Sequence, residues 1–176
     1  MKYFIFLFLT VFLSLNHCKT NSSAQSQPIT NSDVQNYYYT VTFEFTKHTY
    51  RFISKNINDG NLSFDIQTPT DMFLVAYKDN KLLFLSELDD PLVMRSIGEN
   101  ELEQTIDKAQ LNINLPKEFS KINDATIFIY KVNEYVENFD TEIKSIKSLA
   151  TLEQKQLITK RYTINSKELA SFLNKK

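Results

Sequence analysis

The sequence is poor in several residue types on which common protein chemistries depend. Its 176 residues include one cysteine, two glycines, two histidines and no tryptophan. One cysteine excludes an intramolecular disulfide framework and a cysteine-rich zinc module, and two glycines exclude a glycine-rich phosphate-binding loop. The 20 Lys and Arg residues are balanced by 21 Asp and Glu residues. This balance leaves no excess of cations to displace counterions from phosphates, so no nucleic-acid partner is predicted.

The chain begins with one positive charge, Lys2, followed by a thirteen-residue apolar run from Tyr3 to Leu15. As a helix this run would cover about 20 Å, which is short of the roughly 30 Å hydrocarbon core of a bilayer. A short positive region followed by an apolar run of this length is typical of a secretory signal peptide. We therefore interpret residues 1–17 as a signal peptide, with a buried N-terminal helix as the alternative.

The only cysteine, Cys18, follows that run in the order Leu15-Asn16-His17-Cys18. This arrangement resembles the lipobox of bacterial lipoproteins, in a relaxed form because Asn16 and His17 stand where the family usually has small residues. The resemblance implies diacylation of Cys18, cleavage before it so that it becomes the new N-terminus, and anchoring of an exported protein to a membrane of the cell envelope. Two acyl chains give stable anchoring, since each buried CH₂ contributes about 0.8 kcal/mol. The alternative is an ordinary secretory signal with an incidental cysteine.

A polar segment separates Cys18 from the first strand pattern. It is rich in Ser, Asn, Gln and Thr, and only Ala24, Ile29 and Val34 are clearly apolar. Such a segment cannot bury enough surface to offset its ordering entropy. We predict a flexible tether over residues 18–36, whose ends would lie roughly 25 Å apart as a random coil. Residues 37–176 are predicted to form a single strand-rich globular domain.

The strand signal is strongest at residues 37–46, where side chains alternate with period two. Tyr37, Tyr39, Val41, Phe43 and Phe45 fall on one face, and the residues between them are mostly polar. Alternation of this kind predicts a half-buried strand. The same reasoning predicts further strands at 48–52, 62–66, 72–77, 82–85, 111–115, 125–132 and 156–164, with 72–77 apolar on both faces and therefore central in its sheet.

Turns and helices complete the predicted domain. Tight turns are predicted at 58–61, where Asp-Gly favours a hairpin, and at 78–81. Residues 86–100 are read as a long irregular connection, 101–109 as a short helix, and 133–155 as part helix and part loop. A C-terminal helix is predicted to begin at an Asn165 or Ser166 cap, with Glu168 completing a capping box, and to run through Leu173.

The pattern predicts a mainly β fold. Seven or eight short strands with turn signals near every ten residues favour an antiparallel β-sandwich-like domain with short helices, including the C-terminal one. A small β-barrel and an α+β arrangement remain open, because period-two alternation alone does not distinguish them.

Candidates for catalysis or metal binding are few, and no cofactor is predicted. His48 is the only histidine after the signal peptide, and it is interpreted as a surface or cross-strand residue within an alternating strand. Glu87, Asp89 and Asp90 form the tightest acidic group, interpreted as a solvated loop, with a Ca²⁺ site conceivable there. An EF-hand calcium loop around Gly60 is excluded, because its first and twelfth positions require carboxylates and are occupied by Lys55 and Ile66.

The consecutive tyrosines Tyr37, Tyr38 and Tyr39 are the candidate interaction surface, since tyrosine offers large contact area at low entropic cost. We therefore predict that the protein is a non-enzymatic binding module of the cell envelope. It would contact a membrane through its acyl chains and bind an envelope protein as its partner. The oligomeric state is not predicted.

Two other classes stay open. One is a carrier of small hydrophobic ligands, with Phe43, Phe45, Phe64 and Tyr77 lining a cavity. The other is a hydrolase that uses two carboxylates converging in one cleft.

Overall fold

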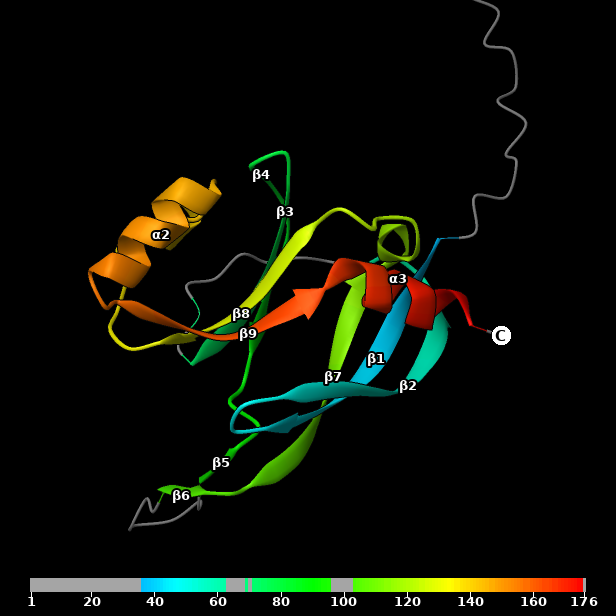
Figure 1. The fold of residues 1–176 in the computed structure, drawn as a ribbon, viewed down its shortest axis with the longest axis horizontal. Helices are drawn as coiled ribbons and strands as arrows, with labels where there is room; N and C mark the ends of the chain where they lie inside the picture. The colour runs from blue at the N-terminus through cyan, green and yellow to red at the C-terminus, as the bar shows by residue number, and fades with distance from the viewer. Residues whose placement is uncertain (1–35, 63–68, 70, 96–102, 176) are drawn as a thin grey trace, which may run out of the picture. The chain divides into compact units, whose positions relative to one another are not determined.

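The computed structural model of the chain describes residues 36–62, 69, 71–95 and 103–175, and β-strands dominate these residues (Figure 1). The predicted signal peptide 1–17, Cys18, the tether up to residue 35 and most of the predicted strand 62–66 lie outside the described residues. The described strands form three antiparallel sheets, accompanied by short helices that include a C-terminal one. The predicted fold class is therefore confirmed.

Sheet A has three strands in the order β2-β1-β7: β2 (Tyr50–Asp59), β1 (Tyr37–Thr46) and β7 (Lys108–Pro116). The predicted bounds of β1 are confirmed, and so is its alternation. The odd-numbered positions from Tyr39 to Phe45 are buried, while Tyr37 at the start of the strand is half-buried. Period-two alternation gives sheet A one apolar inner face and one polar outer face.

Sheet B has four strands in the order β4-β3-β8-β9: β4 (Lys81–Leu88), β3 (Met72–Lys78), β8 (Thr126–Val132) and β9 (Ile158–Asn165). The predicted turn between β3 and β4 is confirmed. Asp79 and Asn80 both have positive φ, 51° and 62°, as a two-residue type I′ hairpin requires. A third, small sheet pairs β5 (Val93–Arg95) with β6 (Glu103–Thr105).

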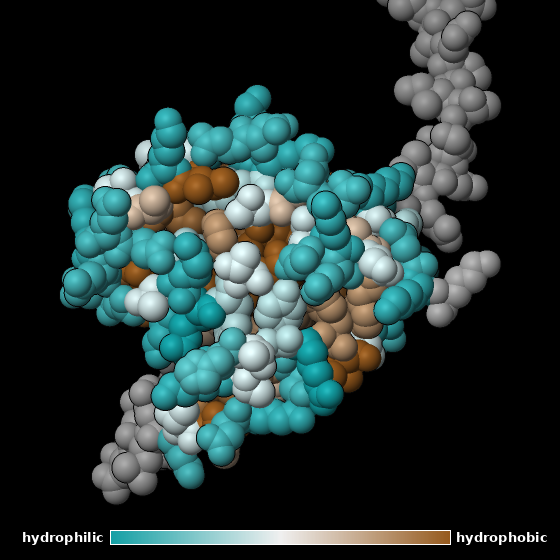
Figure 2. Space-filling view, in the orientation of Figure 1, coloured by the Kyte–Doolittle hydropathy of each residue, from teal (hydrophilic) through white to brown (hydrophobic). Residues whose placement is uncertain are grey.

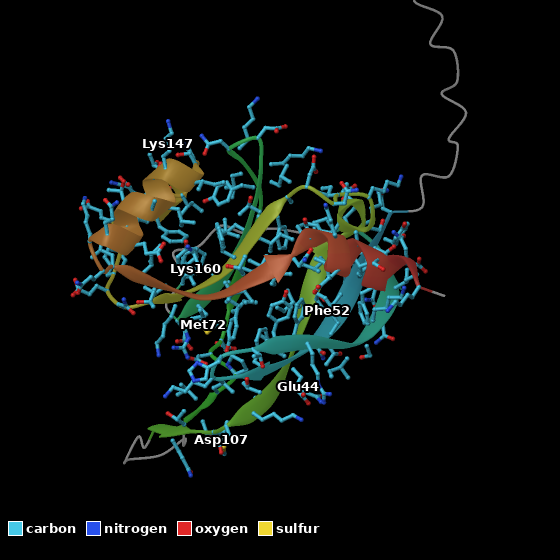
Figure 3. The ribbon with its side chains drawn as sticks, viewed as in Figure 1. Glu44, Phe52, Met72, Asp107, Lys147 and Lys160 are labelled. Atoms are coloured by element: carbon cyan, nitrogen blue, oxygen red, sulfur yellow. The ribbon has the colours of Figure 1, made fainter. Side chains whose placement is uncertain are left out.

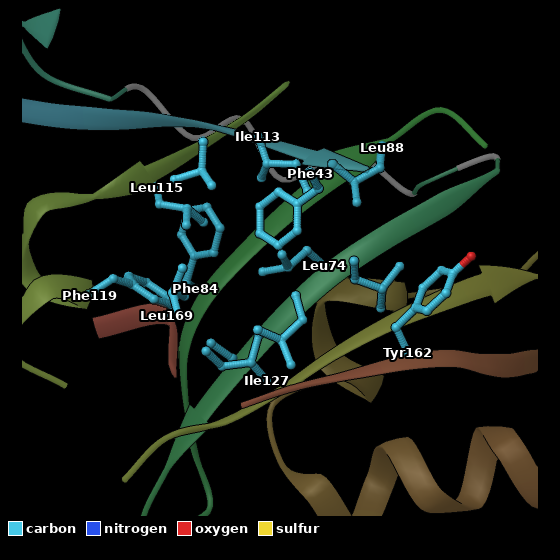
Figure 4. Packing of buried hydrophobic residues seen from close by; sticks show 14 of the residues in the cluster. Phe43, Leu74, Phe84, Leu88, Ile113, Leu115, Phe119, Ile127, Tyr162 and Leu169 are labelled. Carbon is cyan, nitrogen blue, oxygen red and sulfur yellow. The ribbon is translucent and has the colours of Figure 1, made fainter. Parts of the chain in front are cut away.

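Strand β3 is buried on both faces, which explains its unbroken apolar sequence. Met72, Leu74 and Ala76 face sheet A and belong to the first core (Figure 4). Phe73 and Val75 face the other way, together with Tyr77, and belong to the second core. The first core consists of Tyr39, Val41, Phe43, Phe45, Met72, Leu74, Ala76, Phe84, Leu88, Leu92, Ile113, Leu115, Phe119, Ala125, Ile127, Ile129, Tyr162, Ile164, Leu169 and Leu173.

A helical layer covers the second face of sheet B. It comprises α1 (Phe139–Glu142) and α2 (Ile146–Gln154), which match the prediction of part helix and part loop over 133–155. The second core consists of Phe73, Val75, Tyr77, Tyr130, Val136, Phe139, Ile143, Leu149, Leu152 and Ile158. The domain is thus a sandwich of sheets A and B with a helical layer on the outer side of sheet B. Neither sheet closes into a barrel among the described residues, since β2 and β9 are edge strands.

Helix α3 (Ser166–Asn174) is fixed to β2 at both of its ends. At its start the Asn165 side chain accepts hydrogen bonds from the backbone N–H groups of Lys167 (3.0 Å) and Glu168 (3.3 Å), so the predicted cap is confirmed. The Asn165 backbone N–H donates to the Tyr50 hydroxyl at 2.9 Å. At its end the Lys55 ammonium donates to the carbonyls of the last turn, including that of Phe172 at 3.1 Å. These contacts satisfy polar groups that a helix end leaves without intrahelical partners.

The structure corrects the reading of residues 86–109. The predicted irregular connection at 86–100 contains the end of β4, which runs to Leu88, and the strand β5. The predicted helix at 101–109 is wrong, because β6 ends at Thr105 and β7 begins at Lys108. Pairing with the distant strand β1, in which Ala109 lies opposite Phe45, overrides the local helix preference.

Two further predictions change at the ends of β2. His48 lies in the connection before the strand, because the threonines at 46 and 49 close a tight turn through a 2.8 Å contact between their hydroxyls. The predicted turn at 58–61 starts later than expected, since β2 continues to Asp59, opposite Tyr37. Gly60 then takes a φ of +122°, a conformation that favours glycine.

The second core contains one buried polar contact whose removal should be measurable. The Tyr77 hydroxyl donates to the Ile143 carbonyl at 2.6 Å, at the C-terminal end of α1. We expect Tyr77→Phe to lower the free energy of unfolding by about 1–2 kcal/mol, because the buried carbonyl loses its donor. Urea denaturation measures the change. The control is Tyr135→Phe, since Tyr135 is 76% exposed; equal effects of the two variants would contradict the prediction.

Candidate binding groove

A hollow that brings distant parts of the chain together lies between two edge strands, β2 of sheet A and β9 of sheet B. Its volume is about 460 Å³, and it is lined by His48, Thr49, Tyr50, Arg51, Phe52, Arg161, Tyr162, Thr163 and Glu168. In Figure 2 the surface between β9 and β2 is pale, with hydrophilic residues on some sides and more hydrophobic residues on the side towards α3. We call this hollow the edge groove. It exists because sheets A and B are open at this edge and α3 covers only part of it.

Aromatic rings form the floor of the edge groove. The Tyr50 ring lies 5.6 Å from that of Phe52 and 6.4 Å from that of Tyr162, measured between centroids. Phe52, labelled in Figure 3, also stacks on Phe172 of α3, with 5.1 Å between the ring centroids. Tyr162 is buried, whereas Tyr50, Phe52 and Phe172 are half-buried. The floor therefore presents partly exposed rings with positions fixed by the core below them, as a preformed binding surface requires.

The two tyrosine hydroxyls of the floor serve the fold. The Tyr50 hydroxyl accepts the Asn165 backbone N–H, and the Tyr162 hydroxyl donates to the Thr46 carbonyl at 2.7 Å. Burial raises the pKa of both tyrosines above the ordinary value, because a low-dielectric surrounding disfavours the phenolate. Neither hydroxyl is therefore placed to exchange a proton with a ligand near neutral pH.

The rim of the groove is charged. Arg51 is paired with Glu44 of β1, whose second carboxylate oxygen lies 2.8 Å from the Lys108 ammonium of β7. Hydrogen bonds from Arg51 and Lys108 lower the pKa of Glu44 to about 2. His48 is exposed and Arg161 is partly exposed, and neither forms an ion pair with another described residue. Glu168 of α3 is the one acidic residue in the lining.

A second hollow, of about 250 Å³, lies where the described chain begins, and it contains two of the three consecutive tyrosines. Tyr37 and Tyr38 line it beside Lys117, whose ammonium is 5.7 Å from the centre of the Tyr37 ring. Tyr39 does not contribute, because it is only 5% exposed and packs in the first core. The tyrosine run therefore separates into two lining residues and one core residue.

The acidic group at 87–90 is divided by its surroundings. Glu87 and Asp89 are exposed, whereas Asp90 is 5% exposed. One Asp90 carboxylate oxygen accepts the Leu92 N–H at 3.0 Å, and the other lies 3.6 Å from the Lys131 ammonium. The Asp90 N–H donates to the carboxylate of Asp71 at 2.7 Å.

The bonds that the oxygens of these two aspartates accept hold the turn between β4 and β5 together. Nothing in the local sequence around Asp71 indicated this role. The described residues contain no group of three His, Cys, Asp or Glu side chains that could hold a metal ion.

The aromatic residues considered for a ligand cavity do not converge. Phe43 and Phe45 are fully buried in the first core, whereas Tyr77 lies in the second core, on the opposite side of sheet B. Phe64 lies outside the described residues. No single cavity can be lined by side chains that a sheet separates.

Sequence reasoning missed the groove residues of β9 and α3. Arg161 and Thr163 belong to no motif, Glu168 was singled out only for a capping box, and all three lie more than 100 residues from Tyr50 in the chain. Only the packing of sheet A on sheet B brings them together. A comparison with protein-family models found no match, and comparisons with curated proteins and with solved structures found no significant similarity.

The Glu44 ion pairs should give the domain a defined acid sensitivity. The Glu44 pKa is lower in the folded protein, about 2, than its ordinary value of 4.5, so ionised Glu44 stabilises the folded state above pH 4.5. We expect Glu44→Gln to be less stable than wild type at pH 7. The difference should shrink as the pH falls from 4.5 towards 2, because wild-type Glu44 becomes protonated.

Urea denaturation at several pH values measures this difference. The matched control is Glu134→Gln, which removes an exposed carboxylate for which no ion pair with another described residue is seen. A stability difference for Glu44→Gln that stayed constant down to pH 2 would contradict the assignment.

Proposed function

We propose that this protein is a lipid-anchored component of a bacterial cell envelope and that it acts as a non-enzymatic binding module through the edge groove. The observation that carries the binding role is the groove itself. It combines partly exposed aromatic rings, held in place by the first core, with a charged rim. Aromatic residues and arginine are the residue types enriched where proteins bind partners.

The chemistry of the groove supports binding more than catalysis. A nucleophilic mechanism needs a base within hydrogen-bond reach of the nucleophile. His48 forms no hydrogen bond with another described side chain, and the tyrosine hydroxyls of the floor are already engaged. Glu168 is the one carboxylate in the lining of the edge groove, and a two-carboxylate hydrolase needs a second carboxylate in the same site.

The anchoring role rests on residues 1–18. Their resemblance to the signal and lipobox of bacterial lipoproteins supports acylation of Cys18, and the polar residues that follow would connect the lipid to the domain. None of the helices in the described parts of the chain is long and apolar enough to cross a membrane. Two acyl chains on Cys18 would suffice for stable attachment.

Metabolic labelling tests the anchor. Cells expressing the full chain are grown with radioactive palmitate, and the label and the membrane-bound fraction are compared for wild type, Cys18→Ala and the neighbouring control Ser22→Ala. We expect wild type and Ser22→Ala to be labelled and to sediment with membranes, and Cys18→Ala to lose both properties. Unlabelled wild type, or a labelled Cys18→Ala variant, would contradict the proposed anchor.

A further inference from the structure

Helix α3 contacts the β2 edge only through side chains. The Asn165 N–H of its cap bonds the Tyr50 hydroxyl, the Phe172 ring stacks on Phe52, and the Lys55 ammonium donates to the carbonyls of its last turn. From Tyr50 to Ile53 the edge opens into the edge groove, where Ile53 is 39% exposed. An uncovered strand edge is a template for pairing with another extended chain, and proteins usually protect it.

Backbone groups of both edge strands point into this opening. The Thr49 carbonyl accepts the Thr46 N–H, so it faces β1. Because antiparallel strands alternate the direction of their backbone groups, those of Tyr50 and Phe52 face away from β1. On β9 the Asn165 N–H points to Tyr50 and away from β8, so the Thr163 backbone also faces the groove. No described backbone group outside the strand ladders bonds to Tyr50, Phe52 or Thr163.

Cations outnumber carboxylates around the edge groove when the adjoining hollow is included. The whole sequence has a formal net charge of −1, yet the groove lining holds two arginines and one acidic residue. The adjoining hollow over Phe52 and α3 adds two lysines, Lys167 and Lys175. Glu44 already neutralises Arg51, which leaves Arg161 as the cation of the lining that is available to a ligand carboxylate.

We propose that the edge groove binds an acidic peptide segment in extended conformation, which adds as a strand to the open part of β2. This inference rests on the proposed binding function and names the class of its partner. Four residues, matched to Tyr50–Ile53, would span about 13 Å at 3.3 Å per residue. The peptide backbone bonds the free groups of β2, alternate side chains contact the aromatic floor, and a carboxylate reaches Arg161, as in other cases of strand addition.

A model peptide tests this inference on the full chain in non-ionic detergent. The probe is a fluorescein-labelled octapeptide that alternates Glu and Thr, and its binding is followed by fluorescence anisotropy. We expect saturable binding that weakens at least tenfold in Arg161→Gln. The matched control is Lys147→Gln, because Lys147 is an exposed cation on α2, far from the groove in Figure 3; its affinity should equal that of wild type. Thermal unfolding verifies that both variants fold.

Three further probes separate the backbone contribution from the charge contribution. The same peptide N-methylated at alternate residues cannot pair as a strand, and the Lys–Thr peptide reverses the charge; neither should bind. An oligogalacturonate of similar length carries carboxylates without a peptide backbone. Binding of the N-methylated peptide or the oligogalacturonate as tight as that of the Glu–Thr peptide would overturn the inference, and so would the absence of peptide binding.

Analytical sedimentation of the chain without peptide tests whether a second copy of the chain occupies the groove instead. A dimer that dissociates when Arg161 is replaced would mean that a second copy fills the edge, which also overturns the inference. The palmitate labelling is independent of the groove, so its result separates a wrong partner class from a wrong anchor. Oligogalacturonate binding would leave the binding function standing while removing the peptide as its partner.

Discussion

Burial of strand β3 on both faces is the constraint on which the rest of the domain depends. Its side chains are apolar on each side of the sheet, so sheet B can be stable only if a layer covers each face. Sheet A covers the face that carries Leu74, and α1 and α2 cover the face that carries Phe73. Each of these layers is amphipathic and presents its own apolar side to β3 and its neighbours. The three-layer order therefore follows from one strand.

This arrangement leaves the edges of the sheets to be protected separately. The C-terminal helix α3 protects part of the β2 and β9 edges, because Asn165 and Lys55 fix its two ends against β2. The helix has nine residues and would be about 14 Å long, so it covers less than the ten-residue strand β2. Beside the helix, the edge groove stays open between β2 and β9, with the half-buried rings of Tyr50 and Phe52 at its floor. The candidate site is thus a consequence of an incompletely covered sandwich edge.

Local sequence patterns predicted the strands whose burial produces the pattern. They failed for strands that form only because they pair with a distant part of the chain. The alternation from Tyr37 to Thr46 and the two-sided apolar run of β3 identified their strands because burial imposes these patterns directly. The residues before Ala109 have no such pattern, and their strand exists only because β1 pairs with it. The groove was not predictable for the same reason, since Tyr50 and Arg161 meet only after sheet A packs on sheet B.

Native-state hydrogen exchange tests the central claim, that β3 is enclosed on both sides and that the backbone edge at the start of β2 is open. The backbone amides of Leu74, Val75 and Ala76 should exchange only through global unfolding, since β4 and β8 flank β3 on both sides. The amides of Tyr50 and Phe52 should exchange orders of magnitude faster, because they face the open edge. Equal protection of these two sets, or faster exchange in β3, would contradict the layered structure and its open groove.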